Sequence, residues 1–327
     1  MITISDIAKK AGVAKSTVSR YLNGGCVSQE TRKKIDKVVK ETGYVPNPFA
    51  RSLKAKRTYM IGVIIPRLNS PSTNKVLTGM DTTCREKGYQ WIITNSNQDQ
   101  NREIENLYTL AKQKVDGIIL LPKKISSKHE KAFEEISTPI LVLGQRSKNI
   151  PSIIYSDYKA GKTIGEYALK LGHRSFLYVS VSEEDIAVGK ERKKGFLDAV
   201  KKFPETKIKI ITTDFQMDAA YKTALKTLSH LKASFIACAT DTIALAFLKA
   251  AHQLNIPIPE FISLTGFGGY DTLSFVSPSI TTIAYPYYEV GKLAVQQLDR
   301  IIQGFKVPNL VEMPHQLIIK ESTKSIL

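Results

Sequence analysis

The chain has 327 residues, 43% of them hydrophobic, which is enough for two or three packed units, and no apolar run approaches the length of a membrane span. Its net charge of +17 is concentrated at the start, where residues 1–60 hold 13 Lys or Arg against 4 Asp or Glu, as expected of a segment that binds nucleic acid. Three distant cysteines support neither a disulfide framework nor a zinc site, and "MITISDIAKK" lacks a signal-peptide pattern, so we expect a cytoplasmic protein without metal, cofactor or membrane partner.

Three short helices are predicted in the first 43 residues. "TISDIAKKAGV" places Thr3 and Asp6 at capping-box spacing, and Gly12 ends this helix. A second helix begins in "AKSTVSRYLN", and two short helices joined by a glycine-containing turn indicate a helix-turn-helix. The third helix, in "VSQETRKKIDKVVKETG", has Ser28 as its expected N-cap and Gly43 as its end.

The second helix has an unusual outer face. Val18, Tyr21 and Leu22 have the spacing of a buried stripe, which leaves hydroxyls and cations together on the opposite side, without an acid. A solvent-facing helix usually mixes acids with bases. The composition of this face therefore predicts a polyanionic partner.

A connector, "YVPNPFARSLKAKRT", follows the three helices. Asn47 and Pro48 are suited to the N-cap and first turn of a short helix, "PFARSLK". Such a helix is too short to be stable alone in water. We therefore expect it to be ordered by a second subunit or by DNA.

From "MIGVII" onward, continuous apolar runs alternate with helical stretches. The runs are IGVIIP, QWIITN, DGIILLP, PILVLG, SIIYSD, SFLYVSV, IKIITT, SFIACAT and FISLTGF. This alternation is typical of parallel sheets built from βαβ units, and the number of runs favours two α/β subdomains. Ligands of such sheets bind at the carboxyl ends of the strands.

The order of these motifs resembles the LacI/GalR family of bacterial transcription regulators. The resemblance rests on "T-x-x-D-I-A-x-x-A-G-V-x-x-x-T-V-S-R-x-L-N", "V-S-x-x-T-R", "G-Y-x-P-N-x-x-A-R-S-L" and "I-G-V-I-I-P", and extends through "K-V-D-G-I-I-L", "A-T-D-T-I-A-L" and "P-S-I-T-T-I". It implies an α/β fold with a helix-turn-helix domain (1–45), a hinge linker helix (46–58) and a two-subdomain core like periplasmic binding proteins (59–327). The implied function is that of a homodimeric repressor that binds a palindromic operator and is not an enzyme.

Within the family, four segments are most similar to repressors of sucrose operons in Gram-positive bacteria, with trehalose-operon repressors next. They are "IIPRLNS", "AVGKERKKG", "ATDTIALA" and "GFGGYD". The resemblance implies release from DNA by a sugar or sugar phosphate. Trehalose 6-phosphate, a neutral sugar, and action as an activator remain alternatives.

By motif position, the resemblance also implies the residues that contact DNA. Lys15, Ser16 and Arg20 would reach base edges, and Leu53 would wedge into the minor groove. The remaining candidates, most of them phosphate contacts, are Ser5, Thr17, Ser19, Asn23, Ser28, Thr31, Tyr44, Asn47 and Lys54.

Two local readings compete with these roles. The hydroxyls can serve as ordinary helix caps, and Leu53 can be a packed leucine. The family often has Ser or Thr as the N-cap of the recognition helix, whereas this chain has Ala14. That departure should cost about 0.5–2 kcal/mol of local helix stability unless Lys15 or Ser16 compensates.

Candidate effector-binding residues follow the apolar runs, where the fold places its ligand. Arg192 matches the family's sugar-binding arginine, and Phe215 offers a stacking surface. The other candidates are Arg67, Asn69, Ser70, Gln145, Arg146, Ser156, Asp157, Lys190, Thr240, Asp241, Gly268 and Tyr285.

The expected charge of this pocket favours an anionic effector. Many family members have an Asp pair in the loop that here reads "GFGGYD", and Gly268 and Gly269 replace it. Arg67, Arg146 and Lys190 would add to the family arginine, and arginines bind phosphate through charge-assisted hydrogen bonds. Lys190 could equally pair with one of the local acids Glu183, Glu184, Asp185 and Glu191.

Two other classes of protein fit less well. A nucleotide-binding enzyme would need G-x-G-x-x-G spacing, which "GFGGYD" lacks, and no nucleophile elbow, P-loop or metal-ligand pattern is present. An exported sugar receptor would need a signal peptide and would not need the basic head. Both alternatives are therefore disfavoured.

Overall fold

The computed structural model describes residues 2–22, 25–44 and 57–327, and the chain divides into two compact units, Met1–Tyr59 and Met60–Leu327. The first unit contains α1 (Ile4–Ala11), α2 (Lys15–Leu22) and α3 (Gln29–Thr42). Ile7, Val18 and Ile35, one from each helix, are fully buried against one another. Three short amphipathic helices thus share a single small core, as the sequence predicts.

The ends of these helices follow the predicted caps. The Thr3 hydroxyl accepts a hydrogen bond from the Asp6 amide, and the Asp6 carboxylate accepts one from the Thr3 amide at 2.9 Å. Gly12 and Gly43 end α1 and α3 with φ of 64° and 60°, a left-handed conformation that glycine adopts without steric cost. The capping box and both glycine ends are confirmed.

The second unit contains two six-stranded sheets within the part of the chain that the structure describes. The first has the order β11-β5-β4-β3-β1-β2 and the second β12-β10-β9-β8-β6-β7. The first sheet comprises β1 (Met60–Ile65), β2 (Gln90–Asn95), β3 (Gly117–Leu120), β4 (Ile140–Leu143), β5 (Ser152–Tyr155) and β11 (Leu310–Met313). The second comprises β6 (Ser175–Ser180), β7 (Lys207–Thr212), β8 (Phe235–Cys238), β9 (Ser263–Gly268), β10 (Thr281–Ala284) and β12 (Gln316–Ile318).

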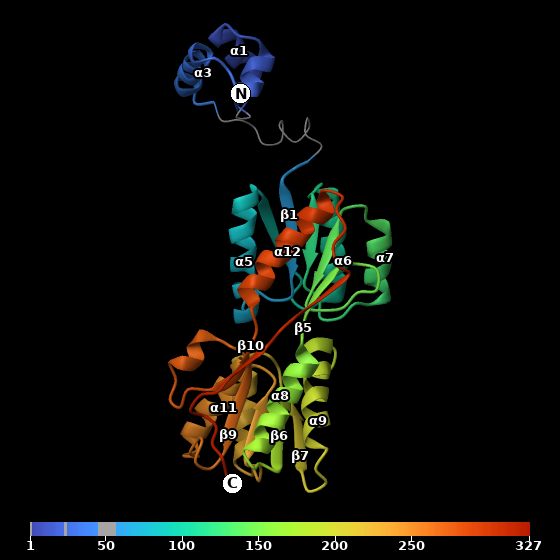
Figure 1. The fold of residues 1–327 in the computed structure, drawn as a ribbon, viewed down its shortest axis with the longest axis vertical. Coiled ribbons are helices and arrows are strands. Elements are labelled where there is room, and N and C mark those ends of the chain that lie inside the picture. Colours follow the sequence, from blue (N-terminus) through green and yellow to red (C-terminus); the bar gives the residue numbers. More distant parts are fainter. Residues whose placement is uncertain (1, 23–24, 45–56) are drawn as a thin grey trace. The chain divides into compact units, whose positions relative to one another are not determined.

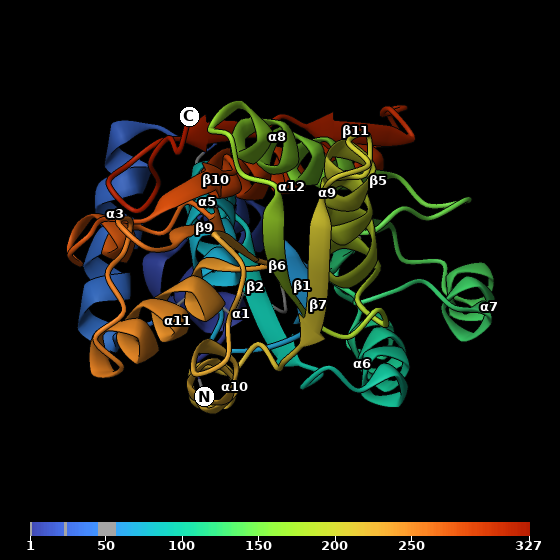
Figure 2. The same cartoon turned by 90° about the horizontal axis from the view of Figure 1, so that it is seen from below.

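Helices cover both faces of each sheet, so each subdomain has three layers (Figure 1). On the first sheet, α5 (Pro71–Lys87) and α12 (Tyr287–Ile302) lie together on one face, and α6 (Gln100–Lys112) and α7 (Ser127–Glu135) on the other. On the second sheet, α8 (Asp157–Lys170) packs with α9 (Lys193–Val200), and α10 (Met217–Leu228) packs with α11 (Asp241–Gln253) on the opposite face (Figure 2). Two short elements, the π-helix η1 (Ile186–Arg192) and the 3₁₀ turn η2 (Asp271–Ser274), complete the fold.

Glycines allow α5 and α12 to pack with their backbones in contact. A Cβ atom at Gly79 would lie 2.0 Å from the carbonyl oxygen of Tyr288, and one at Gly291 would lie 2.0 Å from that of Val76. Any side chain at either position would force the helices apart. The close contact between α5 and α12 therefore depends on glycine at both positions.

The sequence prediction of parallel sheets in two subdomains is confirmed, with one difference. Strand β12 pairs with β10 in an antiparallel register, whereas the other strand pairs are parallel. Strands β10, β11 and β12 were not among the predicted runs. They have three or four residues each, and β11 alternates between exposed and half-buried positions at a sheet edge, so they lack a continuous apolar signal.

No helix in the described ranges is long and apolar enough to cross a bilayer.

Candidate functional site

A cavity of about 380 Å³ lies between the carboxyl ends of the strands of the two sheets. The first subdomain contributes the segment after β1, from Pro66 to Thr73, and the end of β4, from Leu143 to Gln145. The second contributes the π-helix, Phe215 after β7, and Thr240 after β8. The strand ends thus meet where the sequence predicts a ligand.

Arg192 is the most constrained charged group on the cavity wall. Its Nε and Nη2 atoms donate hydrogen bonds to Oδ1 of Asp157 at 3.0 and 2.5 Å, and its Nη1 donates to the Ala239 carbonyl at 2.5 Å. The guanidinium also lies over the rings of Phe267 and Tyr285, 4.8 and 5.4 Å from their centroids. Burial opposes its charge, but Tyr285 and Asp157 outweigh burial and raise the pKa of Arg192.

The π-helix explains how Arg192 reaches the wall. Asp185 caps it by accepting a hydrogen bond from the Val188 amide at 2.9 Å. A Cβ atom at Gly189 would lie 2.1 Å from the Ser182 carbonyl oxygen, so the turn can close only around glycine. The wide turn directs Ala187, Val188 and Arg192 into the cavity, and π-turns of this kind are frequent at functional sites.

Arg67 spans the cavity from the other subdomain. Its guanidinium lies 4.1 Å from the centroid of the Phe215 ring, and burial lowers its pKa against the opposing effect of Tyr270, Asp185 and Asp214. Among the described residues Arg67 has no hydrogen bond or ion pair. A half-buried guanidinium of this kind can donate hydrogen bonds to a ligand oxygen.

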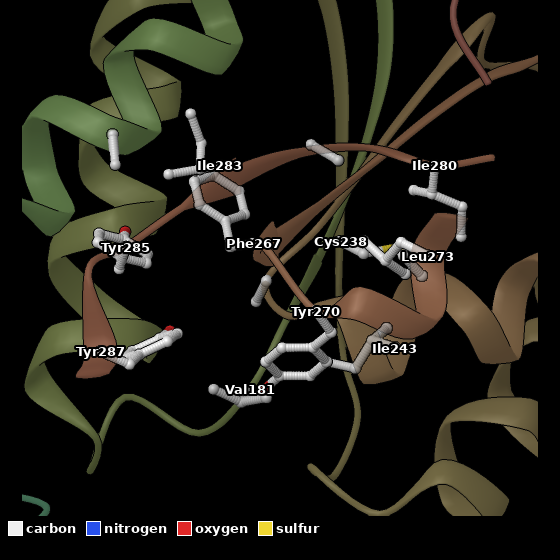
Figure 3. Close-up of a cluster of buried hydrophobic side chains, with 14 of the residues drawn as sticks. Val181, Cys238, Ile243, Phe267, Tyr270, Leu273, Ile280, Ile283, Tyr285 and Tyr287 are labelled. Atoms are coloured by element: carbon white, nitrogen blue, oxygen red, sulfur yellow. The ribbon is translucent and has the colours of Figure 1, made fainter. Parts of the chain in front are cut away.

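Figure 3 shows the apolar layer behind this wall, where Phe267, Tyr270, Tyr285 and Tyr287 extend from the strand ends of the second sheet. Phe267, Tyr270 and Tyr287 reach the cavity itself. The cavity therefore combines aromatic faces with charged groups, a composition typical of pockets for small polar ligands.

Asp241 has a structural position rather than the predicted place on the wall. It is fully buried, and its carboxylate accepts hydrogen bonds from the Thr282 hydroxyl at 2.6 Å and from the Tyr270 amide at 2.9 Å. Burial raises the pKa of Asp241 to about 6. These bonds hold the loop after β9, and through it place the Tyr270 ring against the cavity.

Gly268 also lies behind the wall. Its φ is +144°, and a Cβ atom there would come within 2.6 Å of the Tyr270 ring and 2.9 Å of the Asp241 carboxylate. A larger residue would displace this ring. Gly268 therefore serves the fold of the loop, and it is not on the wall as a ligand residue.

The structure brings only some of the predicted effector-binding residues together. On the wall are Arg67, Asn69, Ser70, Gln145, Asp157, Arg192, Phe215 and Thr240. Away from it are Arg146, Ser156, Lys190, Asp241, Gly268 and Tyr285.

The expected cluster of four cations is therefore not formed. Lys190 is exposed, because it lies on the outer side of the π-turn that directs Arg192 inward. Arg146 is exposed and lines a neighbouring hollow of about 480 Å³, together with Ser156. Tyr285 lies behind Arg192 and donates a hydrogen bond to Asp157 at 3.0 Å.

Several wall residues were missed. Asp185, which the sequence offered only as a partner for Lys190, lines the cavity, and burial raises its pKa. Tyr270 and Gln216 were also missed, although their positions after β9 and β7 could have indicated them. The charged residues on the wall are thus two arginines, Arg67 and Arg192, and two aspartates, Asp157 and Asp185, so the formal charges of the described wall balance.

The outer face of α2 has the predicted composition. Lys15, Ser16 and Arg20 are exposed, Thr17 and Ser19 are half-buried, and the helix packs through Val18 and the half-buried Tyr21 and Leu22. Because Ala14 precedes α2, no side chain is available there to cap the Thr17 amide. Ser5 is exposed on α1.

Three of the predicted phosphate contacts, Ser28, Thr31 and Tyr44, already have local contacts within the first unit. The Ser28 hydroxyl lies 2.8 Å from that of Thr31 and accepts a hydrogen bond from the Thr31 amide, so it caps α3. Tyr44 packs against the core of the first unit. Asn23, Asn47, Leu53 and Lys54, with most of the predicted hinge helix, lie outside the described residues.

Comparison with known proteins identifies the class to which this fold and cavity belong. Residues 3–47 match the model of bacterial regulatory proteins of the lacI family, and residues 166–323 match a periplasmic binding protein-like domain. The chain is 39% identical to the sucrose operon repressor of Staphylococcus xylosus over 309 residues, 93% of this chain and 94% of the relative. The chain therefore belongs to the lacI family of transcription regulators and is a DNA-binding regulator rather than an enzyme.

More distant relatives share the whole architecture. The ribose operon repressor of Halalkalibacterium halodurans is 30% identical and covers 99% of this chain, with 98% of its own length matched. A crystal structure of the Lac repressor dimer bound to operator and the anti-inducer ONPF superposes with a TM-score of 0.90 at 23% identity, covering 99% of each chain. At that identity the structural likeness establishes the fold.

Proposed function

We propose that this protein represses a sucrose-utilisation operon by binding a palindromic operator as a homodimer in the cytoplasm. The basic face of α2 and the likeness to a sucrose operon repressor support this proposal. Residues 1–45 would read one half-site, residues 46–58 would form the hinge helix with Leu53 in the minor groove, and residues 59–327 would bind the effector and dimerise. A sugar in the cavity would release the operator.

The observation that carries the effector proposal is the cavity between the two subdomains, with a partly unsatisfied Arg67 on one side and the Arg192–Asp157 pair on the other. Sugar hydroxyls both donate and accept hydrogen bonds, so they can satisfy carboxylates and guanidinium groups at once. Since the charges of the wall balance, an uncharged sugar fits it best. One structure of similar fold is described as a CelR–cellobiose complex.

A sugar phosphate is the second candidate. Arg67 has no hydrogen bond or ion pair among the described residues, and the N-cap and first turn of α5, Ser70 to Thr73, line the cavity close to it in sequence. Helix N-termini and guanidinium groups both favour phosphate. Of the cations on the wall, only Arg67 is free to supply this contact, because Arg192 is bound to Asp157.

Release of DNA requires that the effector bind the DNA-incompetent arrangement of the subdomains more tightly than the competent one. The test combines calorimetry of the full chain with sucrose, sucrose 6-phosphate and trehalose 6-phosphate, and gel-shift titration of an operator selected from random duplex DNA. We expect at least one sugar to bind and to weaken the operator complex. Binding of none of them, with unchanged operator affinity, would reject the proposed effector.

A further inference from the structure

Three segments of the chain cross between the two subdomains of the core. The first crossover, Tyr155–Asp157, joins β5 to α8; the second, Ala284–Tyr287, joins β10 to α12; the third, Met313–Gln316, joins β11 to β12. Any change in the angle between the subdomains must be absorbed by these segments. Side chains that tie them to one another therefore influence which angles the core adopts.

His315, in the third crossover, is held by residues of the first crossover and of α8. Its Nδ1 lies 2.7 Å from the Ser156 hydroxyl, and its Nε2 lies 2.9 Å from the Thr163 hydroxyl. Thr163 also donates to the Lys159 carbonyl at 3.0 Å, which uses its only hydroxyl proton. Nε2 must therefore donate to Thr163, and in the neutral ring Nδ1 accepts from Ser156.

These contacts continue to the wall of the cavity. The Ser156 amide donates to the Met313 carbonyl at 3.1 Å, which joins the first and third crossovers again through the backbone. The next residue, Asp157, accepts from Arg192 on the cavity wall and from Tyr285 in the second crossover. A continuous set of hydrogen bonds thus links all three crossovers to Arg192.

We propose that His315 is a positioning residue that couples occupation of the cavity to the arrangement of the two subdomains, without touching the effector. By fixing the first crossover beside Asp157, it transmits a displacement of Arg192 to the third crossover. This inference rests on the proposed function in one respect: it takes a ligand in the cavity as the signal.

The charges around His315 agree with a neutral ring at neutral pH. Burial lowers its pKa; Asp157 and Glu312 oppose this effect, and Lys159 adds to it. Lys159 and Glu312 are themselves paired, so their influences largely cancel. Protonation at acidic pH would turn Nδ1 from an acceptor into a donor and force the Ser156 hydroxyl to rotate.

The test compares His315→Leu, which removes both hydrogen bonds, with His315→Gln, which keeps a donor for Thr163. His252→Leu is the matched control, because His252 is exposed at the end of α11. Operator affinity is measured by gel shift with and without sucrose or sucrose 6-phosphate, from acidic to neutral pH, and unfolding is followed by circular dichroism.

The quantity compared is the operator affinity without sugar divided by the operator affinity with sugar. For His315→Leu we expect this ratio to fall by about 2- to 30-fold, with a smaller fall for His315→Gln and none for the control. The pH dependence of this ratio should also flatten in both His315 variants. A Ser156→Ala change should reproduce part of the loss and add little to His315→Leu, because the two residues act through one bond. A lower melting temperature with an unchanged ratio would overturn the proposal.

A measurement without effector separates this inference from the proposed function. Hydrogen exchange of the Ser156 amide should be about tenfold faster in His315→Leu than in wild type or the control, because the crossovers separate more often. If neither sugar binds wild type, the proposed effector is rejected on its own. Equal exchange rates in all three proteins would reject the role of His315 whatever the sugars do.

Discussion

Arg192 donates two hydrogen bonds to one oxygen of Asp157, and both side chains are almost completely buried, with 6% and 5% of their surface exposed. Asp157 begins α8, whereas Arg192 ends the π-helix, so the pair joins the first crossover to the cavity wall. A buried ion pair adds little stability compared with apolar residues, but loss of one partner leaves the other charge buried and unpaired.

Arg192→Met should therefore destabilise the core and abolish effector binding. We expect the free energy of unfolding to fall by about 3–5 kcal/mol, measured by urea denaturation. The control is Arg85→Ala, since Arg85 forms an exposed pair with Asp81 at 2.9 Å and should contribute about 0–1 kcal/mol. Similar losses in the two variants would contradict the distinct role of the buried pair.

Arg67→Ala tests which sugar the cavity binds. Loss of one charge-assisted hydrogen bond should cost about 1.5–3 kcal/mol of effector affinity in calorimetry, while operator binding without effector persists. A phosphorylated effector should lose more affinity than the free sugar, because only the phosphate requires the cation. Arg146→Ala is the matched control, as Arg146 is exposed and lies off the wall; an equal loss there would indicate that the effector extends into the neighbouring hollow.

The buried carboxyl of Asp241 should make the core less stable as the pH rises. Because its pKa is about 6 in the folded protein and about 4 when unfolded, the folded state binds the proton more tightly, and this stabilisation is present below pH 4 and lost between pH 4 and 6. The loss is about 2–3 kcal/mol, at 1.36 kcal/mol for each pKa unit.

Urea denaturation of wild type and Asp241→Asn across this pH range measures the effect as a difference, in which other titrating groups cancel. The asparagine carbonyl can still accept a hydrogen bond from the Thr282 hydroxyl or the Tyr270 amide. The variant should approach or exceed wild type in stability near pH 7. Parallel stability curves for the two proteins would contradict the raised pKa.

The sequence predicts best what local chemistry decides. The helix caps are as expected: Thr3 and Ser28 cap the N-termini of α1 and α3, and Gly12 and Gly43 end these helices. Both kinds of cap depend on only a few neighbouring residues. Long apolar strands were equally clear. Short edge strands such as β11 were not, because its four residues alternate between exposed and half-buried positions and form no continuous apolar run.

The cavity was harder to predict because its wall depends on side-chain direction. Arg192 and Lys190 are two residues apart on the π-helix, and Arg192 points into the cavity whereas Lys190 is exposed. Residues at i and i+2 lie on opposite sides of a helix, so only one of the two can reach the wall, but the sequence alone does not indicate which one. Asp241 follows a strand end, as ligand residues do, but the fold uses it to hold the Tyr270 loop. The position of a residue after a strand therefore makes it a candidate for ligand binding. The packing around it decides whether its side chain contacts a ligand or forms a structural hydrogen bond.

Ala14→Ser should stabilise α2. A serine hydroxyl at the N-cap of α2 can accept a hydrogen bond from the Thr17 amide, which now bonds to the Ala14 carbonyl at 2.9 Å. We expect a gain of about 0.5–2 kcal/mol in local stability, seen as slower hydrogen exchange of the α2 amides. Ala14→Val, which adds bulk without a hydroxyl, is the control, and equal protection in both variants would show that capping is not limiting.

Arg20→Ala tests the proposed reading of DNA by α2. Arg20 is exposed on the acid-free face, and an arginine in the major groove pairs with guanine through O6 and N7. Its removal should cost about 1–3 kcal/mol on the selected operator and much less on random duplex, so base preference at one position relaxes. Lys40→Ala is a matched control, because Lys40 is an exposed cation in the last turn of α3; it should change both affinities little. If Arg20→Ala instead weakened binding to operator and random duplex equally, Arg20 would contact phosphate, and the base-reading role would have to lie with Lys15 or Ser16.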